Sequence, residues 1–130
     1  MEDSASDVFL IRNALRVAQI QAELHIVTDG QKAARFFDEA DDSDEAFCPA
    51  LVILDINLPK MNGDEVLKHI RKSAKCGAVP VLIVSSSDSD WDRKRMLKLG
   101  CDGYFRKPSE YENFLKLGEL VRGLLAGESV

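Results

Sequence analysis

One segment, residues 51 to 63, constrains the fold of this chain more than any other. It opens with a short run of apolar residues, continues with Asp55 and then breaks at Pro59, Asn62 and Gly63. An apolar run this short is typical of a parallel strand buried on both faces and not of a surface helix. Open α/β sheets place their chemistry at the carboxyl ends of their strands. We therefore expect Asp55 to act as a metal ligand, a base or a nucleophile. The plainer interpretation is an aspartate that caps the next turn.

Helices and strands are predicted to alternate along the rest of the chain. Apolar residues at helical spacing indicate helices over residues 8–18, 31–39, 63–73, 90–98 and 111–125. Strands are expected over residues 23–28, 51–55, 81–85 and 104–105. Residues 38–45 are mostly acidic and are expected to form a solvated loop, a weak metal site being the alternative. The alternation predicts an α/β fold with a parallel sheet covered on both faces.

Three polar side chains are expected to meet at one edge of this sheet. Asp55, Ser85 and Lys107 each come at the end of a predicted strand, and the carboxyl ends of parallel strands lie side by side. The carboxylate can attack phosphorus, while the hydroxyl and the ammonium can bind the phosphoryl oxygens. Taken singly, Ser85 is equally typical of a helix cap and Lys107 of a surface charge. Their shared position makes them a candidate site.

Composition limits the classes of protein that need to be considered. The chain has 130 residues, of which 45% are hydrophobic and 30% charged, and this predicts one domain over residues 1–130. The net charge of −5 gives no indication of the positively charged surface that nucleic-acid binding requires. No apolar run is long enough to span a bilayer, and the acidic N-terminus does not resemble a secretory signal. We therefore expect no nucleic-acid or membrane partner and a cytoplasmic location.

The cysteines are the remaining chemical feature of the composition. Cys48, Cys76 and Cys101 are odd in number, widely spaced and match no zinc or redox pattern. In a reducing cytoplasm such residues are expected to be free thiols.

Four motifs together resemble the receiver domain of bacterial two-component response regulators. They are MEDSASDVFLIR at residues 1–12, LDINLPKMNG at 54–63, PVLIVSS at 80–86 and LGCDGYFRKP at 99–108. Within that family the chain looks most like the small stand-alone receivers. The resemblance covers nearly the whole chain and implies a flavodoxin-like, doubly wound parallel sheet of five strands in the order 2-1-3-4-5. It also implies a single receiver domain with no output domain.

The resemblance implies a phosphorylation site and a metal site. Asp55 would accept a phosphoryl group from a histidine kinase or a phosphotransfer protein. Asp3 and Asp55 would bind Mg²⁺ directly, with the backbone carbonyl of Asn57 as a third ligand, and Glu2 would act through water. These oxygen ligands suit Mg²⁺, which screens the two anions that must approach each other. No organic cofactor is implied, and the only reactions expected are phosphorylation of the chain itself and slow autodephosphorylation.

The resemblance also implies a switch that responds to the phosphoryl group. Ser85 would hydrogen-bond a phosphoryl oxygen and Lys107 would pair with it. Tyr104 would be the aromatic side chain whose rotation follows Ser85, a local packing change with a distant effect. Pro108 would follow a cis peptide bond with Lys107.

One departure from the family concerns the first strand. Receivers have an apolar strand before the acidic pair, whereas Glu2 and Asp3 directly follow Met1 here. The expected first strand, near the centre of the sheet, is therefore truncated or absent. We expect one of two explanations. Either the natural chain begins several residues earlier, or two copies of the chain exchange strands in a homodimer.

The output of such a switch is expected on the face formed by the fourth helix, the fifth strand and the fifth helix. The fourth helix is unusually basic at residues 93–95 and carries Trp91, which is either an anchor for a partner protein or a ring covered by an arginine. The expected function is a phosphorylation-activated switch that controls binding of a downstream protein. The alternative is a degenerate or truncated receiver that binds partners without phosphorylation. A phosphohydrolase is a weaker reading, because Asn57 stands where such enzymes need a second aspartate as general acid.

Overall fold

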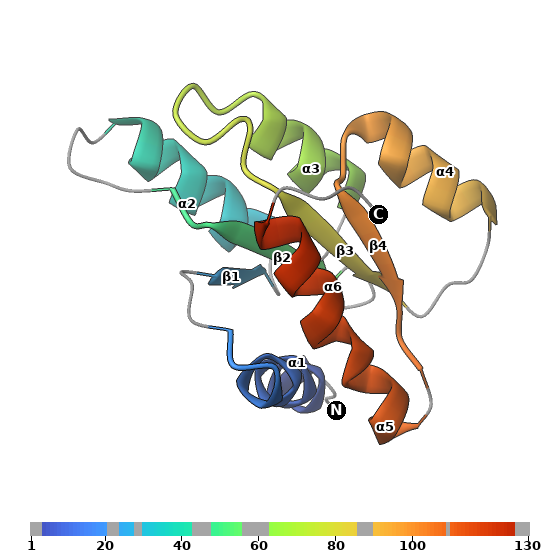
Figure 1. The fold of residues 1–130 in the computed structure, drawn as a ribbon. Helices are drawn as coiled ribbons and strands as arrows, with labels where there is room; N and C mark the ends of the chain where they lie inside the picture. Colours follow the sequence, from blue (N-terminus) through green and yellow to red (C-terminus); the bar gives the residue numbers. More distant parts are fainter. Residues whose placement is uncertain are drawn as a thin grey trace.

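The computed structural model describes residues 4–20, 24–27, 30–42, 48–55, 63–85, 90–108 and 110–126 (Figure 1). The helices are α1 (Ser4–Val17), α2 (Gly30–Asp42), α3 (Gly63–Arg71), α4 (Asp90–Leu99), α5 (Tyr111–Phe114) and α6 (Lys116–Leu125). The strands are β1 (Leu24–Val27), β2 (Leu51–Asp55), β3 (Val81–Ser85) and β4 (Gly103–Arg106). The predicted alternation of helices and strands is confirmed.

All strands of the sheet are parallel and lie in the order β1-β2-β3-β4. This is the expected order 2-1-3-4-5 with strand 1 missing, so that β1 to β4 correspond to strands 2 to 5. β1 pairs directly with β2, with Leu24 opposite Leu51 and Val27 opposite Leu54. The expected gap, to be filled by an earlier segment or by a second copy, is therefore absent from the described sheet. The physical reason is that buried backbone N–H and C=O groups need hydrogen-bond partners, and β1 and β2 supply them to each other.

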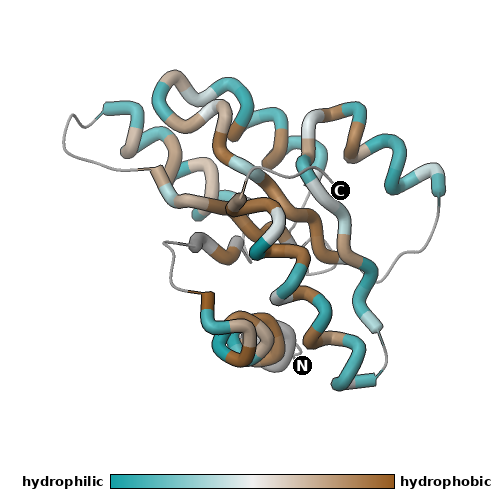
Figure 2. The backbone as a smooth tube through the Cα atoms, viewed as in Figure 1, coloured by the Kyte–Doolittle hydropathy of each residue, from teal (hydrophilic) through white to brown (hydrophobic). Residues whose placement is uncertain are grey.

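Alternate residues of the central strands supply two separate cores, one on each face of the sheet. Val52, Leu54, Val81 and Ile83 pack with α2, α3 and α4, whereas their neighbours in the sequence pack with α1, α5 and α6. Every apolar residue of β2 and β3 is fully buried, as expected for a parallel strand covered on both faces. Figure 1 shows the two helical layers, and Figure 2 shows the hydrophobic strands between helices with hydrophilic outer turns.

Two helices differ from the sequence expectation. Residues 38–42 continue α2 and are not a loop. Asp41 explains this, because its carboxylate accepts hydrogen bonds from the Ser73 hydroxyl and from the backbone N–H groups of Ala74 and Lys75. The single predicted C-terminal helix is divided at Leu115 into α5 and α6. The end of α4 agrees with the prediction, since Gly100 adopts a φ of 108° that suits glycine.

The prediction of three free cysteine thiols is wrong. Cys48 and Cys76 form a disulfide with their Cα atoms 5.5 Å apart, while Cys101 is free and buried. Sequence spacing gave no sign of the bond, because these cysteines are separated by 28 positions and meet only through the pairing of β2 with β3. None of the described helices combines the length and the apolar character needed to cross a membrane. The assignment of residues 1–130 to one domain without an output domain stays a prediction.

Candidate functional site

The three strands named by the sequence end together at one edge of the sheet. β2 ends at Asp55, whose Cα is in register with Val84, and Ser85 follows as the last residue of β3. The backbone N–H of Lys107, directly after β4, donates a hydrogen bond of 2.7 Å to the carbonyl oxygen of Ser85. The structure thus brings the backbones of Asp55, Ser85 and Lys107 to one edge. The side chain of Asp55 lies outside the described atoms.

Ser85 and Tyr104 lie on the same face of the sheet. Ile83 is in register with Tyr104 and Ser85 with Arg106, so Ser85 and Tyr104 are diagonal neighbours on adjacent strands. Side chains two residues apart along a strand point to the same side. Both side chains are buried, with exposed fractions of 1% for Ser85 and 7% for Tyr104. The two buried side chains therefore occupy neighbouring positions on this face of the sheet.

The predicted cis peptide bond before Pro108 is wrong. No peptide bond among the described residues is cis, and the Lys107–Pro108 bond is trans. The trans form is the more stable isomer of an X–Pro bond by roughly 0.5–1 kcal/mol. The hydrogen bond from Lys107 to Ser85 positions the backbone entering this turn without the rarer isomer.

The remaining predicted metal ligands cannot be placed. Glu2, Asp3 and Asn57 lie outside the described residues, so their roles stay predictions. In the part of the chain that the structure describes, no three acidic, histidine or cysteine side chains gather as a metal site would require. Oxygen donors of the kind that Asp3, Asp55 and Asn57 carry are the ligands that Mg²⁺ prefers, and of these residues the structure places only the backbone of Asp55, at the end of β2.

α4 connects Tyr104 with the surface of the molecule. The guanidinium carbon of Arg93 lies 5.5 Å from the centre of the Tyr104 ring, a distance at which a cation attracts an aromatic face. The guanidinium of Arg95 lies 5.0 Å from the centre of the Trp91 ring and also pairs with Asp64 on α3. Trp91 remains 66% exposed. The interpretation of Trp91 as a ring covered by an arginine is therefore confirmed, whereas its role as an anchor for a partner protein stays a prediction.

A shallow hollow on this surface has an unusual lining. It is formed by Trp91, Lys94, Arg95 and Lys98, which recur every three or four residues and so lie on one side of α4. Lys94 and Lys98 form no ion pair with the described residues. The hollow thus offers a large aromatic surface surrounded by positive charge on a chain whose net charge is negative.

Sequence reasoning missed the side chain that organises the opposite edge of the sheet. Arg71 donates hydrogen bonds to the carbonyl oxygens of Gly77, Val79 and Gly100 at 2.6 to 3.0 Å and pairs with Asp102 at 2.9 Å. It joins the loops that precede β3 and β4. Nothing in the local sequence marks Arg71, because its partners are distant carbonyl oxygens that only the folded chain brings together.

Residues 1–118 match the family model described as the response regulator receiver domain. The response regulator Rcp1 of Synechocystis sp. is 30% identical over 117 residues, which amount to 90% of this chain and 80% of Rcp1. The family model therefore extends over the whole described sheet and ends within the first turn of α6.

Solved structures of similar proteins have the same fold. The phosphorylated cyanobacterial phytochrome response regulator RcpA has a TM-score of 0.80 at 27% identity, over 99% of this chain and 93% of RcpA. A response regulator receiver domain from Rhodospirillum rubrum has a TM-score of 0.79 at 29% identity, over 99% and 93%. The Mn²⁺-bound form of Rcp1 has a TM-score of 0.75 at 28% identity, over 95% and 88%. These likenesses confirm the predicted flavodoxin-like class.

Proposed function

Because the chain belongs to the receiver-domain family of response regulators, we propose that it is a switch turned on by phosphorylation of Asp55. Receiver domains are signalling proteins of two-component systems and not enzymes in the usual sense. The assignment of Asp55, Ser85 and Lys107 to the phosphorylation site rests on one observation. The Asp55–Val84 register and the Lys107–Ser85 hydrogen bond support it, because they bring the backbones of these residues to the same sheet edge.

The chemistry proposed at this edge is transfer from a phosphohistidine. A carboxylate oxygen of Asp55 attacks phosphorus, the phosphorus–nitrogen bond breaks, and the departing imidazole keeps the electron pair and takes up a proton. The donor is a histidine kinase or a phosphotransfer protein, and the site of action is the cytoplasm. Lys107 pairs with the new phosphoryl oxygens and Ser85 donates a hydrogen bond to one of them.

A divalent cation supports this transfer. Receiver domains bind divalent metal, and one similar protein has been solved with Mn²⁺ bound. Asp3, Asp55 and the backbone carbonyl of Asn57 would hold Mg²⁺, with Glu2 acting through water. When bound, the ion neutralises charge between the carboxylate and the phosphoryl group.

The proposed output surface is α4, β4 and the helices α5 and α6, which correspond to the face expected from the sequence. Tyr104 on β4 contacts Arg93 on α4, so a change at Ser85 reaches the helix that carries Trp91. The downstream partner is a protein that binds this face with an affinity that depends on phosphorylation. Trp91 is a suitable anchor because large aromatic residues often dominate binding energies at interfaces.

The test is phosphorylation with a small phosphodonor in the presence of Mg²⁺. We expect the intact protein to gain the mass of one phosphoryl group and the Asp55→Asn variant to gain none. Asp42→Asn is the matched control, because Asp42 is an exposed carboxylate at the end of α2. Labelling of the Asp55→Asn protein would place the acceptor elsewhere. An unlabelled native protein that still binds a partner would favour the phosphorylation-independent alternative.

A second experiment identifies the donor. The purified chain is offered to candidate histidine kinases and phosphotransfer proteins, and the rate of phosphoryl transfer is compared between them. A cognate donor is expected to transfer much faster than the others. Transfer must disappear in the Asp55→Asn variant and survive in Asp42→Asn.

A further inference from the structure

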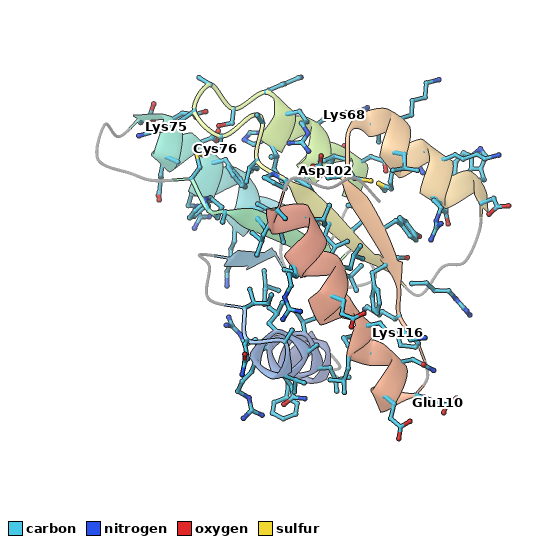
Figure 3. The ribbon with its side chains drawn as sticks, viewed as in Figure 1. Lys68, Lys75, Cys76, Asp102, Glu110 and Lys116 are labelled. Atoms are coloured by element: carbon cyan, nitrogen blue, oxygen red, sulfur yellow. A yellow bond between two sulfur atoms is a disulfide. The ribbon has the colours of Figure 1, made fainter. Side chains whose placement is uncertain are left out.

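The disulfide lies at the edge of the sheet opposite Asp55. Cys48 precedes β2, whose first residue is Leu51, and Cys76 lies in the loop of residues 72–80 that leads from α3 to β3. Figure 3 shows Cys76 beside α2, at the end of the molecule away from Glu110, which follows the carboxyl end of β4. The covalent ring closed by the bond contains all of β2 and α3 and therefore the proposed acceptor.

The loop that carries Cys76 is held by groups other than sulfur. The Asp41 carboxylate accepts hydrogen bonds from the Ser73 hydroxyl at 2.6 Å and from the Lys75 backbone at 2.9 Å. The Ser73 hydroxyl oxygen in turn accepts a hydrogen bond of 3.0 Å from the backbone N–H of Cys76. These contacts do not depend on the disulfide, so opening the bond leaves Cys76 where it was.

Arg71 holds the other half of the same loop. One of its nitrogens donates to the carbonyl oxygens of Gly77 and Val79 at 3.0 and 2.6 Å. Gly77 is required there, because a Cβ atom would lie 2.6 Å from the carbonyl oxygen of Ser73. The loop is thus positioned from both sides, and a Cys76 thiol held in this way re-forms its bond with Cys48 readily because their encounter is intramolecular.

The environment of the three sulfur atoms favours thiol–disulfide exchange at the Cys48–Cys76 bond without interference from Cys101. Cys76 is only 2% exposed, whereas Cys48 is half-buried and offers the sulfur that a reductant can reach. The remaining thiol does not compete, since burial and the neighbouring Asp102 raise the pKa of Cys101 to about 11. At neutral pH Cys101 stays protonated and is a poor nucleophile toward the disulfide.

We propose that Cys48 and Cys76 form a reversible thiol–disulfide site that opens and closes while the domain stays folded. A dithiol reductant attacks the Cys48 sulfur as a thiolate, the bond to Cys76 breaks, and the Cys76 sulfur keeps the electron pair and takes up a proton. The second thiol of the reductant then attacks the mixed disulfide, which releases Cys48 as a thiol and leaves the reductant oxidised. The protein gains two electrons and two protons, and an oxidised dithiol reverses the exchange.

The expected consequence is control of stability from the edge opposite the phosphorylation site. Disulfides in reducing compartments are mostly transient or redox-sensing, which suits a bond that the surrounding loop does not need. Closing the ring restricts the unfolded chain and tightens the start of β2 against the loop before β3. Oxidation therefore prolongs the life of the folded receiver, and phosphorylation at the far edge remains possible in both states.

The test uses the purified full chain equilibrated with mixtures of reduced and oxidised dithiothreitol in graded ratio. Alkylation after unfolding counts thiols by mass, and we expect Cys101 alone to react in the oxidised protein and all three cysteines in the reduced one. The midpoint of thermal unfolding should fall on reduction by roughly 10 °C. Circular dichroism should show that the reduced protein is still folded before heating.

Matched variants separate the pair from the third cysteine. Cys48→Ser and Cys76→Ser should each abolish the effect of reductant on the unfolding midpoint, whereas Cys101→Ala should keep it. If either serine variant does not fold, alkylation of the native protein alone decides the matter. Three reactive thiols under oxidising buffer, a disulfide that opens only after global unfolding, or disulfides between chains would each overturn the proposal.

Discussion

The backbone N–H of Lys107 donates a hydrogen bond of 2.7 Å to the carbonyl oxygen of Ser85. This bond ties the end of β4 to the end of β3, so main-chain atoms alone hold the backbones of Lys107 and Ser85 together. Replacing either side chain leaves this backbone hydrogen bond in place. Substitutions of Ser85 or Lys107 therefore report on the role of the side chain in phosphorylation and not on folding.

Removing the Ser85 hydroxyl is expected to uncouple phosphorylation from Tyr104. Ser85→Ala keeps the backbone bond to Lys107, so the protein should fold and accept a phosphoryl group. The chemical shifts of the Tyr104 ring, measured by NMR with and without a tetrahedral fluoride mimic of phosphate, should change in the native protein and not in Ser85→Ala. Ser85→Thr retains the hydroxyl and serves as the control. An unaltered response in Ser85→Ala would exclude this route.

Replacing Arg71 is expected to destabilise the domain strongly. Arg71→Met leaves the carbonyl oxygens of Gly77 and Gly100 without their donor and leaves Asp102 without its cation. We expect a loss of about 2–4 kcal/mol in the free energy of unfolding, measured in urea. Arg35→Met is the control, because Arg35 is exposed on α2 and should change stability little. A loss no larger than that of the control would show that these contacts contribute little.

Asp41 is expected to make stability depend on acid pH. The Ser73 hydroxyl, followed by the Lys75 backbone, hydrogen-bonds the carboxylate and holds the pKa of Asp41 below its ordinary value of 3.8. Since the folded pKa is depressed, the stabilisation is complete above the unfolded pKa and is lost as the pH falls through the folded one. Asp41→Asn should therefore lower the thermal midpoint at neutral pH, and its difference from the native protein should shrink at strongly acid pH. A difference independent of pH would contradict this assignment.

Close contact between α1 and α6 is expected to exclude any side chain at residue 118. A Cβ atom on Gly118 would lie 2.5 Å from the Cβ of Ala18 and 2.9 Å from the carbonyl oxygen of Ala14. Gly118→Ala should destabilise the protein by roughly 1–3 kcal/mol through overpacking, although alanine is the better helix former. Glu119→Ala, an exposed substitution in the same helix, is the control. Equal stability of the two variants in urea unfolding would mean that α1 and α6 can separate at no cost.

The sequence by itself determined the class of fold and the position of the candidate site. Runs such as residues 51–54 and 81–84 are buried on both faces of the sheet as their uniform apolar character required. Because such strands run parallel, residues at their carboxyl ends share an edge, and the hydrogen bond between the backbones of Lys107 and Ser85 agrees with this expectation. These are local patterns whose physical meaning does not depend on distant parts of the chain.

Only the tertiary structure decided which distant groups meet. The direct pairing of β1 with β2, the Cys48–Cys76 bond and the contacts of Arg71 all join residues far apart in the sequence. The helical state of residues 38–42 belongs with them, since Asp41 is held by the loop before β3 and not by its neighbours in the chain. Local composition predicts how a segment interacts with water, but the partner of each polar group follows from which backbones the packed sheet brings within hydrogen-bonding distance.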